Sequence, residues 1–392
     1  MPHPETPKLV IGNRYREIDG LRALAAFLVI WGHSGEMAGA ISTSSGLTDY
    51  YTNIARLGSS GVTLFFIISG FLITGILIDT KDQPRRFKNF YIRRTLRIFP
   101  LYYLGIFFIF ILMLFFRQSG GDYNLASVYI YHILFISNWV PFFDLDNFAT
   151  SYADLAWFAH LWSLAVEQQF YIVWPALFFF MFRKTDQRQL LLILVGLIIF
   201  STLLRVYFTY SFYWLPAYIG TLTRMDALFM GAALAVMLSY EPETLKKINL
   251  ASRAIVPFLM VVLVLVFIVT AGKSAFLINI PLSIVPLTAC LYFFLVNAMI
   301  MPGRDNRLRK SLNNPVVQHA GTISYGLYIF SAPVQIALGN ILILYGSKDF
   351  WFNHAVMFFP GLAITYLMAT LSYTFMEKPI MRLKKIWAPY KH

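Results

Sequence analysis

Long apolar runs recur along the whole chain, and they constrain the fold more than any other feature of the sequence. Runs of about 18 or more mostly apolar residues have the length that an α-helix needs to cross a bilayer. The 392 residues are 58% hydrophobic and only 13% charged, which is too little polar surface for a water-soluble protein of this length. The sequence therefore predicts an all-α, polytopic integral membrane protein.

We expect about ten transmembrane helices. Their predicted spans are 20–39, 61–79, 98–116, 160–182, 189–209, 223–240, 254–271, 277–301, 317–344 and 353–375. A further apolar run, 127–143, is short and aromatic and contains His132 and Asn138. We expect this run to be a re-entrant or outer-surface element, since irregular backbone at membrane depth needs protein or a watery cavity around it.

The distribution of Lys and Arg predicts the orientation. With both termini cytoplasmic, the inner segments hold 25 of the 32 Lys and Arg residues. These segments are 1–19, 80–97, 183–188, 241–253, 302–316 and 376–392. If 127–143 crossed the membrane, the acidic stretch with Asp144, Asp146 and Asp154 would move inside and every later basic loop outside, against the positive-inside rule.

The chain is thus expected to form one membrane domain, 1–392, with a cytoplasmic N-terminal tail at 1–19 and a basic cytoplasmic tail at 376–392. The net charge of +13 is explained by the inner loops, so no nucleic-acid partner is expected. The first 20 residues are polar, so we expect no cleavable signal peptide. The single Cys290 allows no intrachain disulfide, and Cys-x-x-Cys spacing is absent, so no metal is expected.

Ionisable residues inside the predicted spans point to a functional site, because charges in a membrane are costly. Arg22 and His33 are eleven residues apart, which brings them within about 20° of the same helix face and about 16 Å apart along the axis. Glu167 lies about 10 Å below the outer end of its span, and Ser69 reaches a comparable depth. We expect His33, Glu167 and Ser69 to converge on one layer; the alternative is hydrogen bonding that only holds helices together.

Two further sets of residues have both a functional and a structural interpretation. Arg94 and Arg97 share a face at the start of a helix, which suits bidentate binding of a multi-phosphate ligand but also serves as a topology signal. His160 precedes Glu167 by seven residues and lies on the same face, at the membrane interface, where it is either functional or merely solvated.

Two acidic residues are expected at the starts of helices. Arg224 and Asp226 begin a span, either as a local ion pair or as part of the site. Asp19 is expected to be the N-cap of the first span.

Seven motifs in the order of one family now narrow the interpretation. They are IDGLRALAAFLVIWGH, GVTLFFIISGFLITGIL, FYIRRTLRIFPLYY, HLWSLAVEQQFYIVWP, RMDALFMGAALA, ISYGLYIF and SYTFMEKP. Over about residues 17 to 380 the chain resembles the membrane-bound acyltransferase-3 family. The resemblance implies ten transmembrane helices, a bacterial inner-membrane location, and transfer of an acyl group, usually acetyl from acetyl-CoA, to a hydroxyl.

Acceptors in that family are mostly sugars of cell-surface or exported glycans, and sometimes macrolides or other small molecules. The family histidine, arginine and glutamate correspond to His33, Arg22 and Glu167, and its R-x-x-R pair to Arg94 and Arg97. Two departures are expected to matter. Ser331 stands where many members have a histidine. We also expect the stand-alone form of the family, without the extracytoplasmic hydrolase-like domain of some members.

Together these features predict a mechanism in which the CoA phosphates bind near Arg94, Arg97 and Arg22. His33 would act as general base on the acceptor hydroxyl, a glycan or lipid-linked saccharide, with Glu167 orienting it. Supporting or substrate-binding roles are expected for Ser69, Trp162, His160, Arg224 and Tyr325. Direct transfer and an acyl-enzyme both fit. A proton-coupled transporter or flippase is the alternative from another class, although no internal repeat favours it, and a non-catalytic scaffold is the third.

Overall fold

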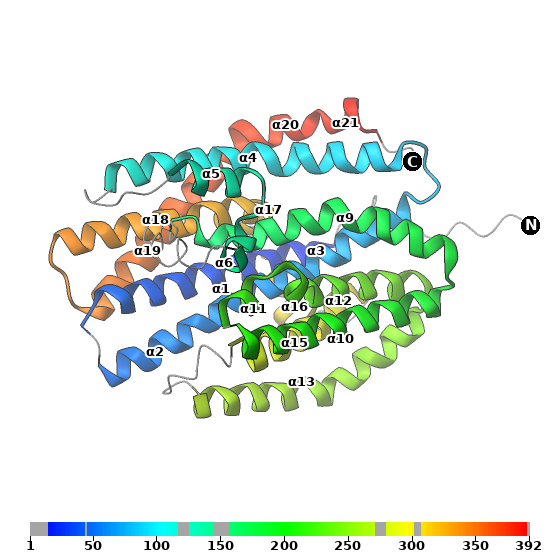
Figure 1. Cartoon of the computed structure of the whole chain (residues 1–392), viewed down its shortest axis with the longest axis horizontal. Helices are drawn as coiled ribbons and strands as arrows, with labels where there is room; N and C mark the ends of the chain where they lie inside the picture. The colour runs from blue at the N-terminus through cyan, green and yellow to red at the C-terminus, as the bar shows by residue number, and fades with distance from the viewer. Residues whose placement is uncertain are drawn as a thin grey trace, which may run out of the picture.

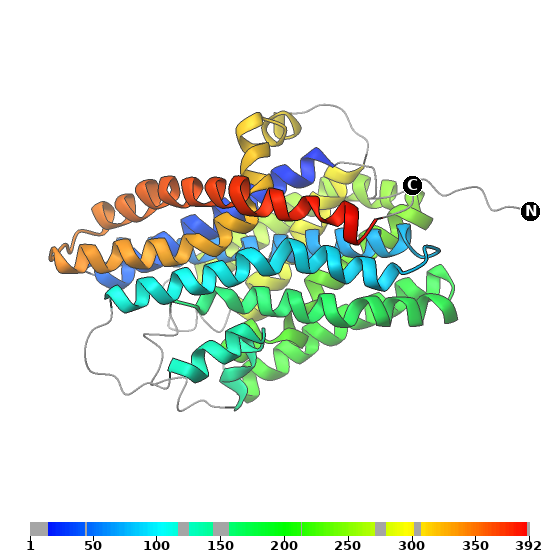
Figure 2. The same cartoon turned by 90° about the horizontal axis from the view of Figure 1, so that it is seen from above.

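The computed structural model describes residues 15–43, 45–116, 125–143, 157–212, 214–270, 280–301 and 307–389, and these contain helices and no strand. The long helices lie side by side with their axes roughly aligned (Figures 1 and 2). They are α1 (Arg16–Ile41), α3 (Ser60–Asp79), α4 (Arg86–Phe116), α9 (Trp162–Lys184), α10 (Gln187–Ser211), α12 (Thr221–Tyr240), α13 (Pro242–Thr270), α15 (Val285–Ile300), α18 (Ser324–Leu344) and α19 (Phe350–Ser372).

Ten segments of the described chain are long and apolar enough to cross a membrane, one at each predicted span. The prediction of an all-α, ten-span membrane protein is therefore confirmed. Several segments continue through short elements. These are α2 (Gly46–Arg56) with η1 (Leu57–Ser59) before α3, η3 (Ala159–Leu161) before α9, α11 (Trp214–Ile219) before α12, η4 (Ile280–Ile284) before α15, and η5 (Tyr373–Glu377), α20 (Lys378–Arg382) and α21 (Lys384–Trp387) after α19.

The apolar run at 127–143 forms no spanning helix. It comprises α5 (Leu125–Ile133), η2 (Ser137–Trp139) and α6 (Val140–Phe143), each too short to cross a bilayer. Asn138, fully buried in η2, donates to Thr221 Oγ1 at 2.7 Å and accepts from Gln169 Nε2 at 2.9 Å. These bonds fix the segment against the first residues of α12 and the N-terminal half of α9. The acidic stretch with Asp144, Asp146 and Asp154 lies outside the described residues.

Helices α3 and α12 pack closely, and glycines make their approach possible. A Cβ atom on Gly70 would collide with the backbone oxygen of Leu228, and one on Gly231 with that of Ile67. Close backbone contact through small residues is the usual basis of helix association in membranes. Gly70 of the SG motif thus packs helices, while its neighbour Ser69 belongs to the site described below.

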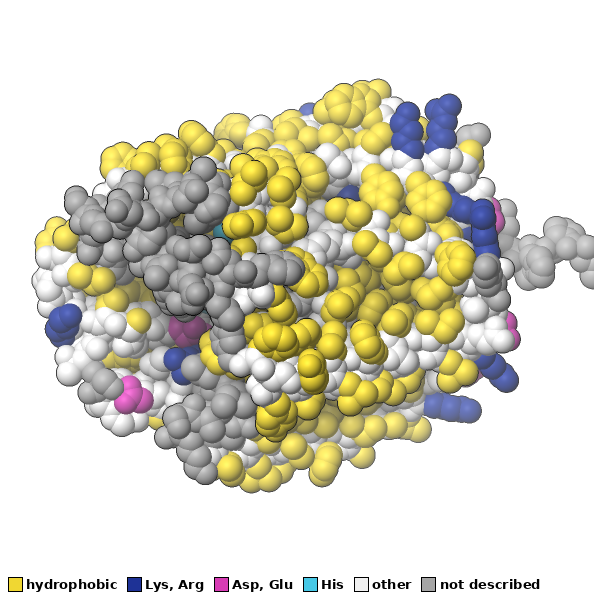
Figure 3. Space-filling view, viewed as in Figure 1, with side chains coloured by type: hydrophobic (Ala, Val, Ile, Leu, Met, Phe, Trp, Pro, Cys, Tyr) yellow, Lys and Arg dark blue, Asp and Glu magenta, His cyan; other side chains and the backbone are white. Residues whose placement is uncertain are grey.

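The outer surface has the chemistry expected of a protein in lipid. Apolar side chains cover much of the flank of the bundle in Figure 3, and Lys and Arg gather at its right-hand end. Large exposed apolar residues on α10 and α13 include Leu192, Tyr210, Phe258 and Ile268. In water such a surface would promote aggregation, whereas in a bilayer the acyl chains solvate it. The cytoplasmic placement of both termini stays a prediction, and residues 1–14 and 390–392 lie outside the described chain.

Three local predictions need correction. The first helix begins at Arg16 with Tyr15 as N-cap, so Asp19 lies inside the helix and pairs with Arg22 at 3.8 Å instead of capping it. α4 begins at Arg86, so Arg94 and Arg97 lie well inside the helix. The predicted span 317–344 is divided into α17 (Pro315–Thr322) and α18.

The interpretation of Arg224 and Asp226 as a local pair is also wrong. Asp226 pairs with Arg205 of α10 at 2.7 Å, with both side chains almost completely buried. Arg205 also donates to the backbone oxygen of Thr223 at 2.7 Å. This pair joins α10 to α12 away from the cavities of the molecule.

Candidate functional site

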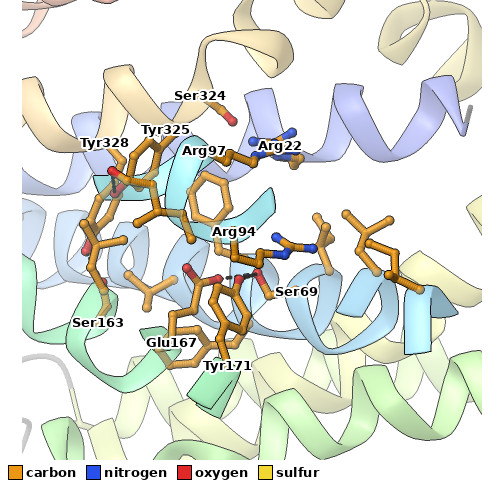
Figure 4. A pocket seen from close by; sticks show the side chains of 18 residues that line it. Arg22, Ser69, Arg94, Arg97, Ser163, Glu167, Tyr171, Ser324, Tyr325 and Tyr328 are labelled. Carbon is orange, nitrogen blue, oxygen red and sulfur yellow. Dashed lines mark hydrogen bonds between the residues drawn. The ribbon is translucent and has the colours of Figure 1, made fainter. Parts of the chain in front are cut away.

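Three cavities in the described part of the bundle bear on its function. The arginine cavity is lined by Arg22 of α1, Ser69 of α3, Arg94 and Arg97 of α4, Glu167 and Tyr171 of α9, and by residues of α18 that include Tyr325 and Tyr328. Figure 4 shows these side chains, from five separate helices, around one space. It contains most of the residues that the sequence singled out.

Three side chains on one wall of the arginine cavity are joined by hydrogen bonds, and we call this set the polar relay. The hydroxyl of Tyr171 donates to Ser69 Oγ at 3.0 Å, and the Ser69 hydroxyl in turn donates to Glu167 Oε1 (Figure 4). Glu167 and Tyr171 are four residues apart on α9, so they share a face, and α3 brings Ser69 to both. The predicted convergence of Ser69 and Glu167 is present in the structure.

Cations line the same cavity. The Arg94 guanidinium lies 5.1 Å from the ring centre of Tyr171, and Arg22 and Arg97 also line the space. Three guanidinium groups and one carboxylate therefore face it among the described residues. This excess of positive charge suits a polyanionic ligand, and guanidinium groups bind phosphate oxygens in pairs.

A rim cavity continues this space towards the end of the bundle that carries most of the basic residues. Arg22, Arg97 and Tyr325 line both spaces, and the rim adds Asp19 and Glu377. Tyr325 also donates to the backbone oxygen of Ile98 at 3.3 Å. The arginine cavity thus adjoins a polar rim at this end of the bundle.

The histidine cavity occupies the other half of the bundle. It is lined by His33 and Glu36 of α1, Arg56 and Ser59, His132 and Ser137, His160 and Trp162, Trp214 and Tyr218, and by further residues. His33 Nδ1 is buried and makes no hydrogen bond to any residue that the structure describes. His160, which is 5% exposed, has its Nε2 atom 3.1 Å from the backbone oxygen of Ile329.

The structure therefore separates two residues that the sequence placed together. His33 lines the histidine cavity and Glu167 the arginine cavity, and no hydrogen bond joins them among the described residues. The two cavities share Val62 and Tyr328 as lining residues. Tyr328 is held in this shared wall because its hydroxyl bonds to Ser163 Oγ at 2.6 Å and to the backbone oxygen of His160 at 2.7 Å.

Arg224 lies between aromatic rings instead of in a cavity. Its guanidinium is 5.2 Å from the ring centre of Tyr218 and 5.7 Å from those of Phe66 and Trp162. It is 1% exposed and donates to Thr63 Oγ1 at 2.9 Å. Cation–π contacts of this kind are strong when desolvated, so Arg224 fixes the rings that line both cavities.

Ser331, which the resemblance aligns with a family histidine, is not among the residues that line the three cavities. It is fully buried and donates to the backbone oxygen of Tyr328 at 3.1 Å within its own helix. None of the described His, Cys, Asp and Glu residues form a group of three or more that could hold a metal ion.

Sequence reasoning missed Tyr171, Tyr328, Glu36, His132 and Arg56 as lining residues. Three of them had a signal: Tyr171 is four residues after Glu167, Glu36 three after His33, and Tyr328 three after Tyr325, so each shares a face with a residue already chosen. His132 and Arg56 gave none, because their approach to the cavities depends on how helices and short turns pack.

The fold and cavities define a polytopic membrane protein with a cationic site at one end of the bundle and a histidine-lined site at the other. A family model described as an acyltransferase domain matches residues 15–373. The chain therefore belongs to this acyltransferase family, as its motifs predicted.

Relatives with assigned names share that description. The chain is 30% identical over 381 residues to the peptidoglycan O-acetyltransferase OatA of Listeria monocytogenes, covering 93% of this chain and 55% of the relative. It is 29% identical over 374 residues to a Bacillus subtilis protein with the provisional name peptidoglycan O-acetyltransferase YrhL, covering 93% and 54%. The chain thus spans about half the length of these relatives. No solved structure matches it.

Proposed function

We propose that this protein is a membrane O-acetyltransferase that moves an acetyl group from acetyl-CoA to a hydroxyl of a cell-surface glycan. Family membership and the names of the relatives support the reaction class. The observation that carries the proposal is the arrangement of the two cavities, one cationic and one with His33, which meet at Val62 and Tyr328. A donor and an acceptor can enter such a pair of spaces from opposite ends.

The donor belongs in the arginine cavity. Arg22, Arg94 and Arg97 bind the phosphates of CoA in this proposal, and the pantetheine arm extends past Glu167 and Ser69 towards the shared wall. The rise of about 16 Å between Arg22 and His33 along α1 is the distance that the arm covers. The basic end is the predicted cytoplasmic side, where acetyl-CoA is available.

The chemistry takes place where the cavities meet. The acceptor hydroxyl enters from the histidine cavity, and His33 accepts its proton as general base. The hydroxyl oxygen attacks the thioester carbonyl, so a C–O bond forms and the C–S bond breaks. CoA leaves as the thiolate and takes up the proton from His33. Glu167 and Ser69, which are joined by a hydrogen bond, position the thioester arm.

This assignment places the protein in the bacterial plasma membrane, with acyl-CoA, the bilayer and a glycan or lipid-linked saccharide as partners. A peptidoglycan strand is the acceptor that the named relatives suggest. A macrolide or other small acceptor would enter the same histidine cavity.

The test uses the purified protein in lipid nanodiscs, which leave both ends accessible. Labelled acetyl-CoA is added with solubilised peptidoglycan fragments, and free CoA and labelled saccharide are measured. Matched release of CoA and acetylated saccharide supports the proposal. Binding of acetyl-CoA without transfer to any saccharide would point to another acceptor, and movement of a solute without CoA release would favour a transporter.

A further inference from the structure

The histidine cavity contains a carboxylate that the proposed reaction does not use. Glu36 is three residues after His33 on α1, so both side chains lie on one face, and both line this cavity. Arg56 lines the same space, so the cavity also contains a guanidinium group. Glu167, in contrast, accepts a hydrogen bond from Ser69 in the arginine cavity. Among the described lining residues, Glu36 is thus the carboxylate that shares a space with His33.

Aromatic rings form another wall of this cavity. The ring centres of Trp162 and Tyr218 are 5.3 Å apart, and those of Trp214 and Tyr218 are 6.2 Å apart. Arg224 fixes this wall from behind by its contacts with Trp162 and Tyr218. The rings are therefore a rigid surface within the cavity that holds Glu36 and His33.

This combination is suited to one class of ligand. Small-molecule sites are mostly apolar and aromatic, with a few polar groups that fix orientation. A pyranose ring has a C–H face that packs on an aromatic ring and hydroxyls that donate to a carboxylate. Neighbouring ring hydroxyls can donate to the two oxygens of Glu36 together, as a carboxylate accepts at both oxygens.

We propose that Glu36 is an acceptor-binding residue, which accepts hydrogen bonds from hydroxyls of a sugar ring lying on Trp214 and so presents an adjacent hydroxyl to His33. The inference rests on the proposed function for its reaction, but the binding site can be tested without it. It predicts that substitution of Glu36 changes the affinity for the acceptor and not the affinity for acetyl-CoA. A purely structural Glu36 would only balance the charge of Arg56.

Binding of chitotetraose, a soluble oligomer of β-1,4-linked N-acetylglucosamine, tests the site directly. Isothermal titration in nanodiscs compares wild type with Glu36→Gln, Glu36→Asp and the control Asp49→Asn, which changes an exposed carboxylate on α2 outside the cavity. We expect Glu36→Gln to weaken binding about tenfold, because bonds to an ionised group are lost, while Glu36→Asp retains part of the affinity and Asp49→Asn all of it. Equal affinities for wild type and Glu36→Gln, or no binding to wild type, overturn the proposal.

Two further measurements separate the alternatives. In the double variant Glu36→Gln/Arg56→Gln, a charge-balancing role predicts recovered binding, whereas a sugar-binding role predicts that binding stays weak. With acetyl-CoA present, Glu36→Gln should raise the KM for the acceptor and leave the Kd of acetyl-CoA unchanged; a weakened Kd with an unchanged acceptor KM overturns the inference. Saccharide binding to wild type without acetyl transfer would refute the proposed function and leave the binding site in place.

Discussion

The arginine cavity and the histidine cavity differ in how their polar groups are satisfied. In the first, Tyr171, Ser69 and Glu167 form a continuous set of hydrogen bonds in a space that three guanidinium groups also line. In the second, the buried Nδ1 atoms of His33 and His160 have no hydrogen-bond partner in the described part of the chain. The first is a preformed cationic site, and the second contains imidazole nitrogens that a ligand could reach. Under the proposed function, donor binding and proton transfer therefore fall in separate halves of one bundle.

Replacing His33 is the strongest way to break this comparison. His33→Ala should lower the rate of acetyl transfer by about 10²-fold or more, the usual contribution of a general base, while acetyl-CoA binding is retained. Transfer is followed by labelled saccharide and binding by titration. His354→Gln is the control, since His354 bonds Tyr51 at 2.9 Å and lines neither cavity. A large loss of acetyl-CoA affinity in His33→Ala would contradict the assignment of donor binding and proton transfer to different cavities.

The arginines should show the opposite pattern. Arg94→Ala and Arg97→Ala should each weaken acetyl-CoA binding about 10- to 100-fold, because bonds to charged groups contribute about 1.5–3 kcal/mol. The affinity for chitotetraose should not change. The Lys variants should recover part of the affinity, since lysine keeps the charge but not the planar fork. Unchanged acetyl-CoA affinity in both Ala variants would show that the CoA phosphates do not bind in this cavity.

Substitutions of Tyr328 test whether the shared wall separates the two cavities. Tyr328→Ala opens the wall between the two cavities, so water can reach the thioester, and CoA release without acceptor should rise severalfold. Tyr328→Phe keeps the ring and loses two hydrogen bonds, worth about 0.5–1.5 kcal/mol each, so its acceptor-independent release should stay close to that of wild type. Equal release in both variants would show that Tyr328 does not separate the spaces.

The smallest effect is expected for Ser69. Ser69→Ala removes both the bond from Tyr171 and the bond to Glu167. Because the bond to Glu167 is the one that positions the thioester arm, transfer should slow about 2- to 10-fold, in line with about 0.5–1.5 kcal/mol for that bond. Ser163→Ala is a useful comparison, because Ser163 bonds Tyr328 at the shared wall instead of Glu167. A loss as large as that of His33→Ala would indicate a direct chemical role for Ser69.

The sequence by itself determined the architecture. Length and hydropathy predicted ten spans, since a bilayer imposes one helix length and leaves no other way to satisfy the backbone. The motif spacing also placed Arg22 and His33 on one face of α1. Ser69 and Glu167 were predicted at one depth because both spans start from the same side, and the hydrogen bond between them agrees with this.

Only the tertiary structure decided which residues share a cavity. Depth along a helix comes from counting residues, but the direction in which a face points depends on which neighbour packs against it. His33 and Glu167 were predicted at similar depth, yet they line different spaces because Val62 and Tyr328 stand in the wall between them. For the same reason Asp226 pairs with Arg205, on another helix, instead of with Arg224 two residues away. Helix periodicity fixes neighbours within one helix, and packing chooses the neighbours between helices.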